Sequence, residues 1–282
     1  MTSPILDTWA QWQRAQGLSE RTIRERNVTM TALFAFTDSD PLSLSPFHII
    51  HYCARADIGP SSRASYHATI RAFCKWAQQV KLRPDNPALE TPVPKRPKQE
   101  PRPVADQHLA AMLSRVNRKR TTAYILFASL AGLRVHEVAK LHGRDIDLVA
   151  GSITVTGKGN KTALLPLHDD LRIVVEAYPR DDWWFPTYAA HTGKQHIGAH
   201  AVSGAIRRVM RAADVPGTPH ALRHWYGTSL LENGVDLRIV QELMRHESPA
   251  TTARYTRVNF SARITGISTL QLPNTFTERM AA

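Results

Sequence analysis

Apolar residues recur at helical spacing through residues 1–90, and two stretches carry the clearest stripes. The first follows Ser19, a residue type that often caps helix N-termini, and its apolar positions are Ile23, Met30, Leu33 and Phe34. The second follows the serines at 61 and 62, and its apolar positions are Tyr66, Ile70, Phe73, Ala77 and Val80. Each spacing predicts an amphipathic helix that buries one face, so a helical domain is expected here.

The pattern from residue 104 onward predicts further helices. Asp106 is expected to cap one helix, a second is expected at about residues 121–131, and Asp236 is expected to start another. An asparagine followed by a glycine, at 233–234, is expected to end a helix. Ser248 and Pro249 begin the last predicted helix, because proline suits the first helical position. The remaining apolar stripes contain Leu109, Met112 and Leu113, then Val202, Ile206, Val209 and Ala213, then Leu222, Tyr226 and Leu230.

A change of period within this region marks a small sheet. Residues 152–156 alternate apolar and polar side chains, and residues 162–167 are mostly apolar. The segment GKGNK at 157–161 joins them and has the glycines of a hairpin turn. The predicted fold class is therefore mainly α with a small β-sheet, in which the second domain is of the α+β type.

A proline-rich segment separates the two patterns. Residues 91–103 read TPVPKRPKQEPRP, with five prolines and four lysines or arginines. Proline fixes φ and lacks a backbone N–H, so neither a helix nor a central strand can run through this segment. We therefore predict a helical domain at 1–90, an extended basic linker at 91–103, and a second domain at 104–282 that ends in a tail at 256–282.

Charge narrows the class of partner. The chain has a formal net charge of +12, and both parts are basic: residues 1–103 hold 14 basic and 9 acidic side chains, and residues 104–282 hold 22 and 15. A protein that is basic throughout suits a polyanion that contacts both domains, and nucleic acid fits best. The sequence has no long apolar run, no secretory signal pattern and only two cysteines, Cys53 and Cys74, so a reduced cytoplasmic protein without a membrane partner is expected.

One predicted helix carries a basic face. Arg63, His67, Arg71 and Lys75 follow one another at intervals of four residues, which places them on the same side of a helix. Such a face could follow a phosphate backbone or enter a major groove. The alternative is an ordinary solvated surface.

Four local patterns in the second domain carry the candidate chemistry. They are AGLRVHEVAKL around Arg134, VTGKGNK around Lys158, PHALRHWYG around His220 and Arg223, and LMRHESPATTARYT around His246 and Tyr255. Together and in this order they resemble the tyrosine recombinase family, also called the phage-integrase or Xer-like family. Each pattern alone is weak, but the ordered set is specific, and the resemblance extends over nearly the whole chain.

The chemistry of these residue types agrees with that resemblance. A tyrosine oxygen can attack a phosphodiester and later leave, which preserves the bond for rejoining. Its reference pKa of about 10 means that it needs nearby cations or a base. Arg134 and Arg223 are candidates to bind the non-bridging phosphate oxygens, because a guanidinium is planar and always charged. Lys158, at the tip of a hairpin, is the candidate to protonate the departing 5′ oxygen, with Lys161 as its rival for that role and as a further DNA contact.

The resemblance adds roles for the other residues. It implies that His220 binds phosphate and accepts the proton of Tyr255, and that His246 donates a hydrogen bond to a phosphate oxygen. Glu137, three residues after Arg134, is expected to orient that guanidinium or to cap the chain locally. The resemblance further implies a SAM-like core-binding domain before a catalytic domain, double-stranded DNA as the partner, and a homotetramer on DNA that exchanges C-terminal tails. An accessory directionality factor is a further expected partner.

No cofactor is expected. Gly151 to Lys158 faintly resembles a phosphate-binding loop, but five residues separate its glycines and Gly159 replaces the required Ser or Thr. His191, His196 and His200 lack a standard zinc spacing.

Several biological roles stay open at this point. The Arg-rich sequence favours a phage or mobile-element integrase, and an Xer-type chromosome or plasmid dimer resolvase is the alternative. A type IB topoisomerase would use the same tyrosine chemistry, although the two-domain layout favours a recombinase. A non-catalytic DNA-binding regulator could keep the recombinase fold, although the intact set of site residues argues against it.

Overall fold

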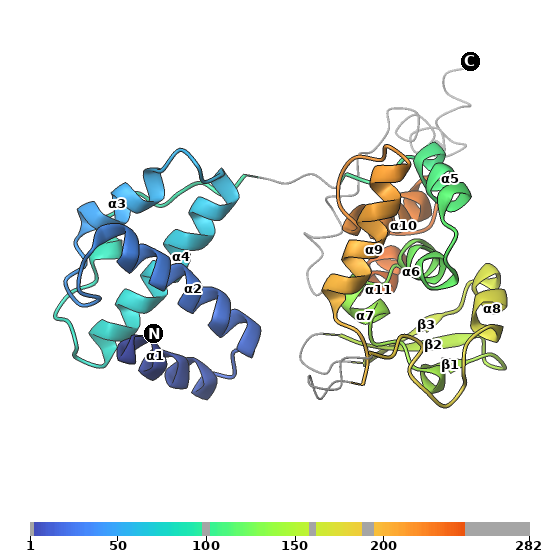
Figure 1. The fold of residues 1–282 in the computed structure, drawn as a ribbon, viewed down its shortest axis with the longest axis horizontal. Helices are drawn as coiled ribbons and strands as arrows, with labels where there is room; N and C mark the ends of the chain where they lie inside the picture. Colours follow the sequence, from blue (N-terminus) through green and yellow to red (C-terminus); the bar gives the residue numbers. More distant parts are fainter. Residues whose placement is uncertain (1–2, 98–101, 158–161, 188–194, 246–282) are drawn as a thin grey trace, which may run out of the picture. The chain divides into compact units, whose positions relative to one another are not determined.

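The computed structural model describes residues 3–97, 102–157, 162–187 and 195–245. The chain divides into two compact units, Met1–Gln99 and Glu100–Ala282 (Figure 1). The division falls inside the proline-rich segment, while the assignment of a DNA-binding role to one unit and a catalytic role to the other stays a prediction. Within the described ranges, no helix combines the length and the apolar character that a bilayer span requires.

The first unit consists of helices. They are α1 (Pro4–Ala15), α2 (Glu20–Thr37), α3 (Pro46–Ala54), α4 (Pro60–Gln79) and the short 3-10 helix η1 (Pro87–Leu89). Ser19 accepts a hydrogen bond from the backbone N–H of Thr22, which confirms its predicted role as the cap of α2. Ile70, Phe73 and Ala77 are fully buried, as the stripe on α4 predicts. The core gathers apolar side chains from α1 to α4, among them Trp9, Met30, Leu33, Ile49, Phe73 and Trp76.

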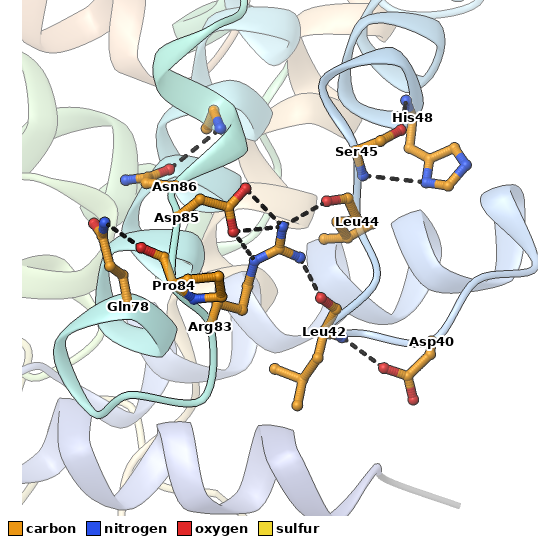
Figure 2. Close-up of polar contacts among 11 residues, drawn as sticks. Asp40, Leu42, Leu44, Ser45, His48, Gln78, Arg83, Pro84, Asp85 and Asn86 are labelled. Atoms are coloured by element: carbon orange, nitrogen blue, oxygen red, sulfur yellow. Dashed lines mark hydrogen bonds and ion pairs between the residues drawn. The ribbon is translucent and has the colours of Figure 1, made fainter.

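An arginine network joins two loops of this unit, and Figure 2 shows it. Arg83, after α4, donates to the carbonyl oxygens of Leu42 and Leu44, which lie before α3, at 2.9 Å in the case of Leu44. The same guanidinium pairs with Asp85 at 3.0 Å, and its side chain is only 8% exposed. We call Arg83, Asp85 and these two carbonyls the Arg83 bridge. It satisfies the backbone of one loop with a side chain of another, 39 or 41 residues away.

The second unit combines helices with a small sheet. Its helices are α5 (Asp106–Arg115), α6 (Lys119–Leu130), α7 (Val135–Val138), α8 (Asp169–Glu176), α9 (Ala199–Ala212), α10 (His220–Glu232) and α11 (Leu237–Leu243), with a 3-10 turn η2 (Gly143–Asp145). In Figure 1 the strands lie together with α8 at one side of this unit, and α5, α6, α9 and α10 make up much of the rest. The predicted end of α10 is confirmed, because Gly234 follows the helix with a φ of 81°. The predicted start of α11 is confirmed too, because Asp236 accepts from the backbone N–H of Arg238 at 2.7 Å.

The sheet has three antiparallel strands in the order β1-β2-β3, which are Ile146–Asp147, Ser152–Thr156 and Thr162–Pro166. Ile153 lies opposite Leu165 in the pairing of β2 with β3, so the predicted hairpin is confirmed. The pattern did not predict β1, which is only two residues long. Ile153, Val155 and Leu165 point into the core that packs against α6 and α9, where they join Phe127, Val138, Phe185, Val202, Ile206 and Leu222.

The cap of α5 differs from its prediction. The helix begins at Asp106 itself, and Ala105 occupies the cap position. The carboxylate of Asp106 instead accepts a hydrogen bond from the indole N–H of Trp225 on α10, at 2.5 Å. A tertiary contact therefore takes the carboxylate away from the backbone that it would otherwise cap.

Candidate active site

The loop between α6 and α7 forms the base of the candidate site. Gly132 lies in this loop with a φ of 59°, a left-handed conformation that glycine adopts without strain. A Cβ at this position would lie 2.5 Å from the Cδ1 of Tyr226, which belongs to α10. The missing side chain of Gly132 thus allows α10 to pack directly against the segment that leads to Arg134.

Arg134 immediately precedes α7, and Glu137 holds it there. The Nη1 of Arg134 lies 3.0 Å from the Oε1 of Glu137, and the backbone N–H of Arg134 donates to the Oε2 at 2.8 Å. The side chain of Glu137 is 1% exposed and that of Arg134 is 33% exposed. The carboxylate is therefore a buried anchor, and the guanidinium it holds is open to an incoming anion.

Arg223 and His220 share one face of α10, since they lie three positions apart on the helix. Arg223 is 1% exposed and donates to the backbone carbonyls of Gly132 and Met244. It therefore joins the loop before α7 to the end of α11, and its positive charge acts on both Glu137 and His220.

His220 is set to exist as a neutral imidazole. Its burial lowers its pKa, and the positive charges of Arg223 and Arg134 lower it further, whereas Glu137 acts in the opposite sense. A neutral imidazole can accept a proton, which is the chemical capacity that the resemblance to recombinases requires of this residue.

The structure adds a residue that the sequence reasoning missed. Arg245 follows α11, and its Nη2 lies 2.9 Å from the Oε2 of Glu137 and 3.2 Å from the carbonyl oxygen of Gly132. Its φ of 52° is unusual for a residue with a side chain. The only signal in the sequence was its position directly before the candidate His246. We call Arg134, Glu137, Arg223 and Arg245 the Glu137 cluster.

The Glu137 cluster has an excess of positive charge. Burial alone would raise the pKa of Glu137, but Arg245, the backbone N–H of Arg134 and the charges of Arg134 and Arg223 outweigh that effect and lower it. The carboxylate thus stays ionised and balances one of three guanidinium groups. Such a cluster is suited to bind an anion with several oxygens, such as a phosphodiester.

Other predicted residues lie outside the described ranges. These are Lys158 and Lys161 between β2 and β3, His246 directly after Arg245, Tyr255, and the predicted helix at Ser248 and Pro249. Their roles stay predictions. Among the residues that the structure describes, no group of three or more His, Cys, Asp or Glu side chains is placed to hold a metal ion.

The basic face predicted on α4 is narrower than its spacing suggested. Arg71 and Lys75 are exposed, and their contact with DNA stays a prediction. His67 is 3% exposed and its Nε2 lies 2.7 Å from the hydroxyl of Thr91, so its predicted place on a DNA-facing surface is wrong. Arg63 is half-buried and donates to the backbone carbonyls of Cys53, Arg55 and Ile58.

Comparison with known proteins gives consistent relatives. Residues 104–262 match the family model described as the phage integrase family. Tyrosine recombinase XerC of Rhodospirillum centenum is 31% identical, in a match that covers 90% of this chain and 82% of that protein. Tyrosine recombinase XerD of Staphylococcus epidermidis is 30% identical, over 88% and 92% of the two chains.

Solved structures give the same result. The integrase from mycobacterium phage Brujita is 40% identical over 96% of both chains, with a TM-score of 0.51. A lambda integrase (residues 75–356) dimer bound to a COC′ core site has a TM-score of 0.73 over 91% of this chain, at 17% identity. At that identity the likeness supports the fold alone, and it confirms the predicted class of a mainly helical protein with a small sheet.

Proposed function

The chain belongs to the phage integrase family of tyrosine recombinases, and from this membership we propose that it cuts and rejoins double-stranded DNA at specific sites through Tyr255. The observation that carries the proposal is the Glu137 cluster, in which the guanidinium groups of Arg134 and Arg245 bond one buried carboxylate and the charge of Arg223 adds to theirs. Its excess positive charge is suited to a phosphate in a transition state, where the non-bridging oxygens gain negative charge.

In the proposed cleavage step, the phenolic oxygen of Tyr255 attacks the scissile phosphorus. The bond from phosphorus to the 5′ oxygen breaks, and a 3′-phosphotyrosyl link forms. His220 accepts the phenolic proton, and Lys158 donates a proton to the departing 5′ oxygen. Arg134, Arg223 and His246 stabilise the charge on the phosphate. A 5′ hydroxyl of a partner duplex then attacks the phosphotyrosyl link, which releases Tyr255 and rejoins the strand.

The first test is covalent capture. The binding site is selected from a pool of random duplexes, and a nick is then placed beside the scissile phosphate so that the cut end is lost. Wild-type protein should form a complex with DNA that survives denaturing electrophoresis. Tyr255→Phe should form none, yet should bind within about twofold of wild type, because phosphate contacts supply most of the affinity and the phenol hydroxyl adds none.

Two outcomes would count against this proposal. A wild-type protein that binds its selected site without a covalent adduct would be a DNA-binding regulator. A Tyr255→Phe variant that fails to bind would show that binding and chemistry are not separate in this chain.

We propose integration and excision of a phage or mobile element as the biological role, inside a bacterial cytoplasm. The 40% identity to a phage integrase over 96% of both chains supports this role. Xer-type dimer resolution is the second candidate, because the XerC and XerD relatives match at 31% and 30% identity. Incubation with two plasmids, one bearing the selected site and one bearing a second attachment site, distinguishes the roles. An integrase joins two different sites, while a resolvase acts on two copies of one site.

The active assembly is proposed to be a homotetramer on DNA, with residues 256–282 passed between subunits and an accessory factor that sets direction. Lambda integrase has been captured as a dimer on a core site, which supports assembly on DNA in this family. Crosslinks between the tail of one subunit and the catalytic unit of another, formed only with DNA present, are the expected result. Crosslinks confined to single subunits would instead indicate packing in cis.

A further inference from the structure

We propose that Arg245 is a positioning residue for the recombination reaction: it holds Glu137, and through Glu137 it fixes the guanidinium of Arg134 where the phosphate binds. This inference rests on the proposed function, because the phosphate is that of the cleaved DNA. Arg245 itself is not assigned a contact with DNA.

The two carboxylate oxygens of Glu137 have different sets of partners. Oε1 pairs with the guanidinium of Arg134 at 3.0 Å, and Oε2 accepts from the backbone N–H of Arg134 and from Arg245, at 2.8 and 2.9 Å. The contacts with Arg134 are local, since the partners lie three positions apart in the chain, and they would move together with the loop. Arg245 comes from 108 residues away and is therefore the ion-pair partner that ties this carboxylate to another part of the unit.

The backbone carbonyl of Gly132 has two arginine partners. It accepts from Arg245 at 3.2 Å and also from Arg223. The end of α11 is thus joined to this part of the unit at two points, the Gly132 carbonyl in the loop before α7 and the Glu137 carboxylate on α7 itself. Because the loop carries Arg134, the position of Arg134 depends on both points.

The charge of Arg245 also affects the ionisation of Glu137. Burial favours the neutral form of Glu137, and the positive charge of Arg245 is the largest influence that opposes it and keeps the pKa low. Loss of Arg245 should therefore raise the pKa of Glu137, so that its carboxyl group protonates at a higher pH than in wild type. A protonated Glu137 would hold Arg134 more weakly. The charged or titratable groups around Glu137 and Arg245 are Arg134, His220, Arg223 and Tyr226.

The backbone conformation at position 245 suits a glycine variant for the test. Arg245 has a φ of 52°, which strains most residues but not glycine. Arg245→Gly therefore removes the guanidinium without added backbone strain. Arg245→Lys keeps a charge but loses the planar guanidinium. Arg172→Gln is the matched control, because the guanidinium of Arg172 also bonds one carboxylate and one carbonyl, of Asp169 and Leu148, on a helix that carries no residue of the site.

The experiment compares these variants with wild type by two independent readouts. The first is the titration of the Glu137 carboxyl carbon, followed by NMR in the protein without DNA. The second is the rate of covalent complex formation on a nicked substrate between pH 6 and 8. Arg245→Gly should raise the pKa of Glu137, and it should slow cleavage about tenfold at pH 8, as small misplacements of catalytic groups do, and by more at pH 6. Arg245→Lys should keep the pKa low and recover part of the rate, and Arg172→Gln should match wild type.

The outcomes separate this inference from the proposed function. If wild type forms no adduct, the recombinase proposal fails, while the titration still tests the contact between Arg245 and Glu137. If wild type cleaves and Arg245→Gly cleaves equally fast at both pH values, the positioning role is wrong. An equal loss of rate at both pH values, with an unmoved Glu137 titration, would also overturn it, because a general structural defect gives that result. If Arg245→Gly does not fold, the titration and rate profile of Arg245→Lys decide.

Discussion

Two arginine networks join distant segments of this chain, one in each unit, and they differ in their balance of charge. In the Arg83 bridge, one guanidinium meets one carboxylate and two backbone carbonyls (Figure 2). In the Glu137 cluster, the guanidinium groups of Arg223 and Arg245 also hold two backbone carbonyls, but the three guanidinium groups of the cluster have a single buried carboxylate among them. The contacts are of the same kind, so the two networks differ in their net charge. A balanced network fixes a loop, and a network with surplus positive charge fixes a loop and attracts an anion.

The largest expected effect is the loss of cleavage rate when the surplus positive charge of the Glu137 cluster is reduced. Arg134→Gln should lower the rate of covalent complex formation by about a hundredfold to a thousandfold, as the loss of one preorganised donor does. Its free energy of unfolding should change by less than about 1 kcal/mol, because the side chain is one-third exposed and Arg245 still pairs with the buried carboxylate of Glu137. Single-turnover cleavage and urea unfolding measure the two quantities. If Arg134→Gln loses stability but cleaves at the wild-type rate, the Glu137 cluster only fixes a loop, as the Arg83 bridge does.

Removing the arginine of the Arg83 bridge should have the opposite result, a loss of stability with an unchanged rate of cleavage. Arg83→Gln leaves two carbonyls and a carboxylate without their partner, so it should destabilise the first unit by about 2–3 kcal/mol. Cleavage at saturating protein and at a temperature where the variant is folded should equal that of wild type. Arg21→Gln is the control, since its pair with Glu25 is exposed and should contribute less than about 0.5 kcal/mol. A slow Arg83→Gln variant with normal stability would show that this network also serves the chemistry.

The smallest effect concerns His67, a buried imidazole that lies against the neutral hydroxyl of Thr91. Burial lowers the pKa of His67, and the charge of Arg71 lowers it further, so the folded protein favours the neutral ring. Below the reference pKa of about 6.5 the unfolded chain binds a proton that the folded chain resists, so stability should fall as the pH drops through this range.

His67→Gln tests this prediction, because it should remove part of that fall while other groups titrate unchanged. Urea unfolding of wild type and variant at pH 5 to 8 gives the difference between the two. Equal pH dependence in both proteins would mean that His67 titrates normally.

Much of the fold follows from local rules, because periodicity and caps act over a few residues. The stripe of Ile70, Phe73 and Ala77 and the cap at Ser19 were predictable for that reason. The place of His67 was predictable in principle, since it lies on the same helical face as Ile70 and Cys74, which are both buried. Its type suggested a solvent-facing residue, but a hydroxyl at Thr91, 24 residues away, satisfies it.

The contacts of the candidate site also divide into local ones, which the sequence predicts, and distant ones, which it does not. Arg134 with Glu137 and His220 with Arg223 are near neighbours in the chain, so their spacing on or beside a helix was enough to pair them. Arg245 meets Glu137 across 108 residues, and no local spacing encodes such a contact. The short strand β1 and the contact of Asp106 with Trp225 were missed for the same reason, since each depends on a partner elsewhere in the fold.

Gly132 has a consequence for how this sequence can change over time. Its left-handed φ and the ring of Tyr226, 2.5 Å from where a Cβ would stand, mean that a side chain at 132 and an aromatic ring at 226 exclude each other. The two positions should therefore vary as a pair across descendants of this chain. In a library randomised at both positions and selected for recombination, most survivors should keep glycine at 132. The exceptions should be asparagine or aspartate there, which tolerate such a φ, always together with a small residue at 226.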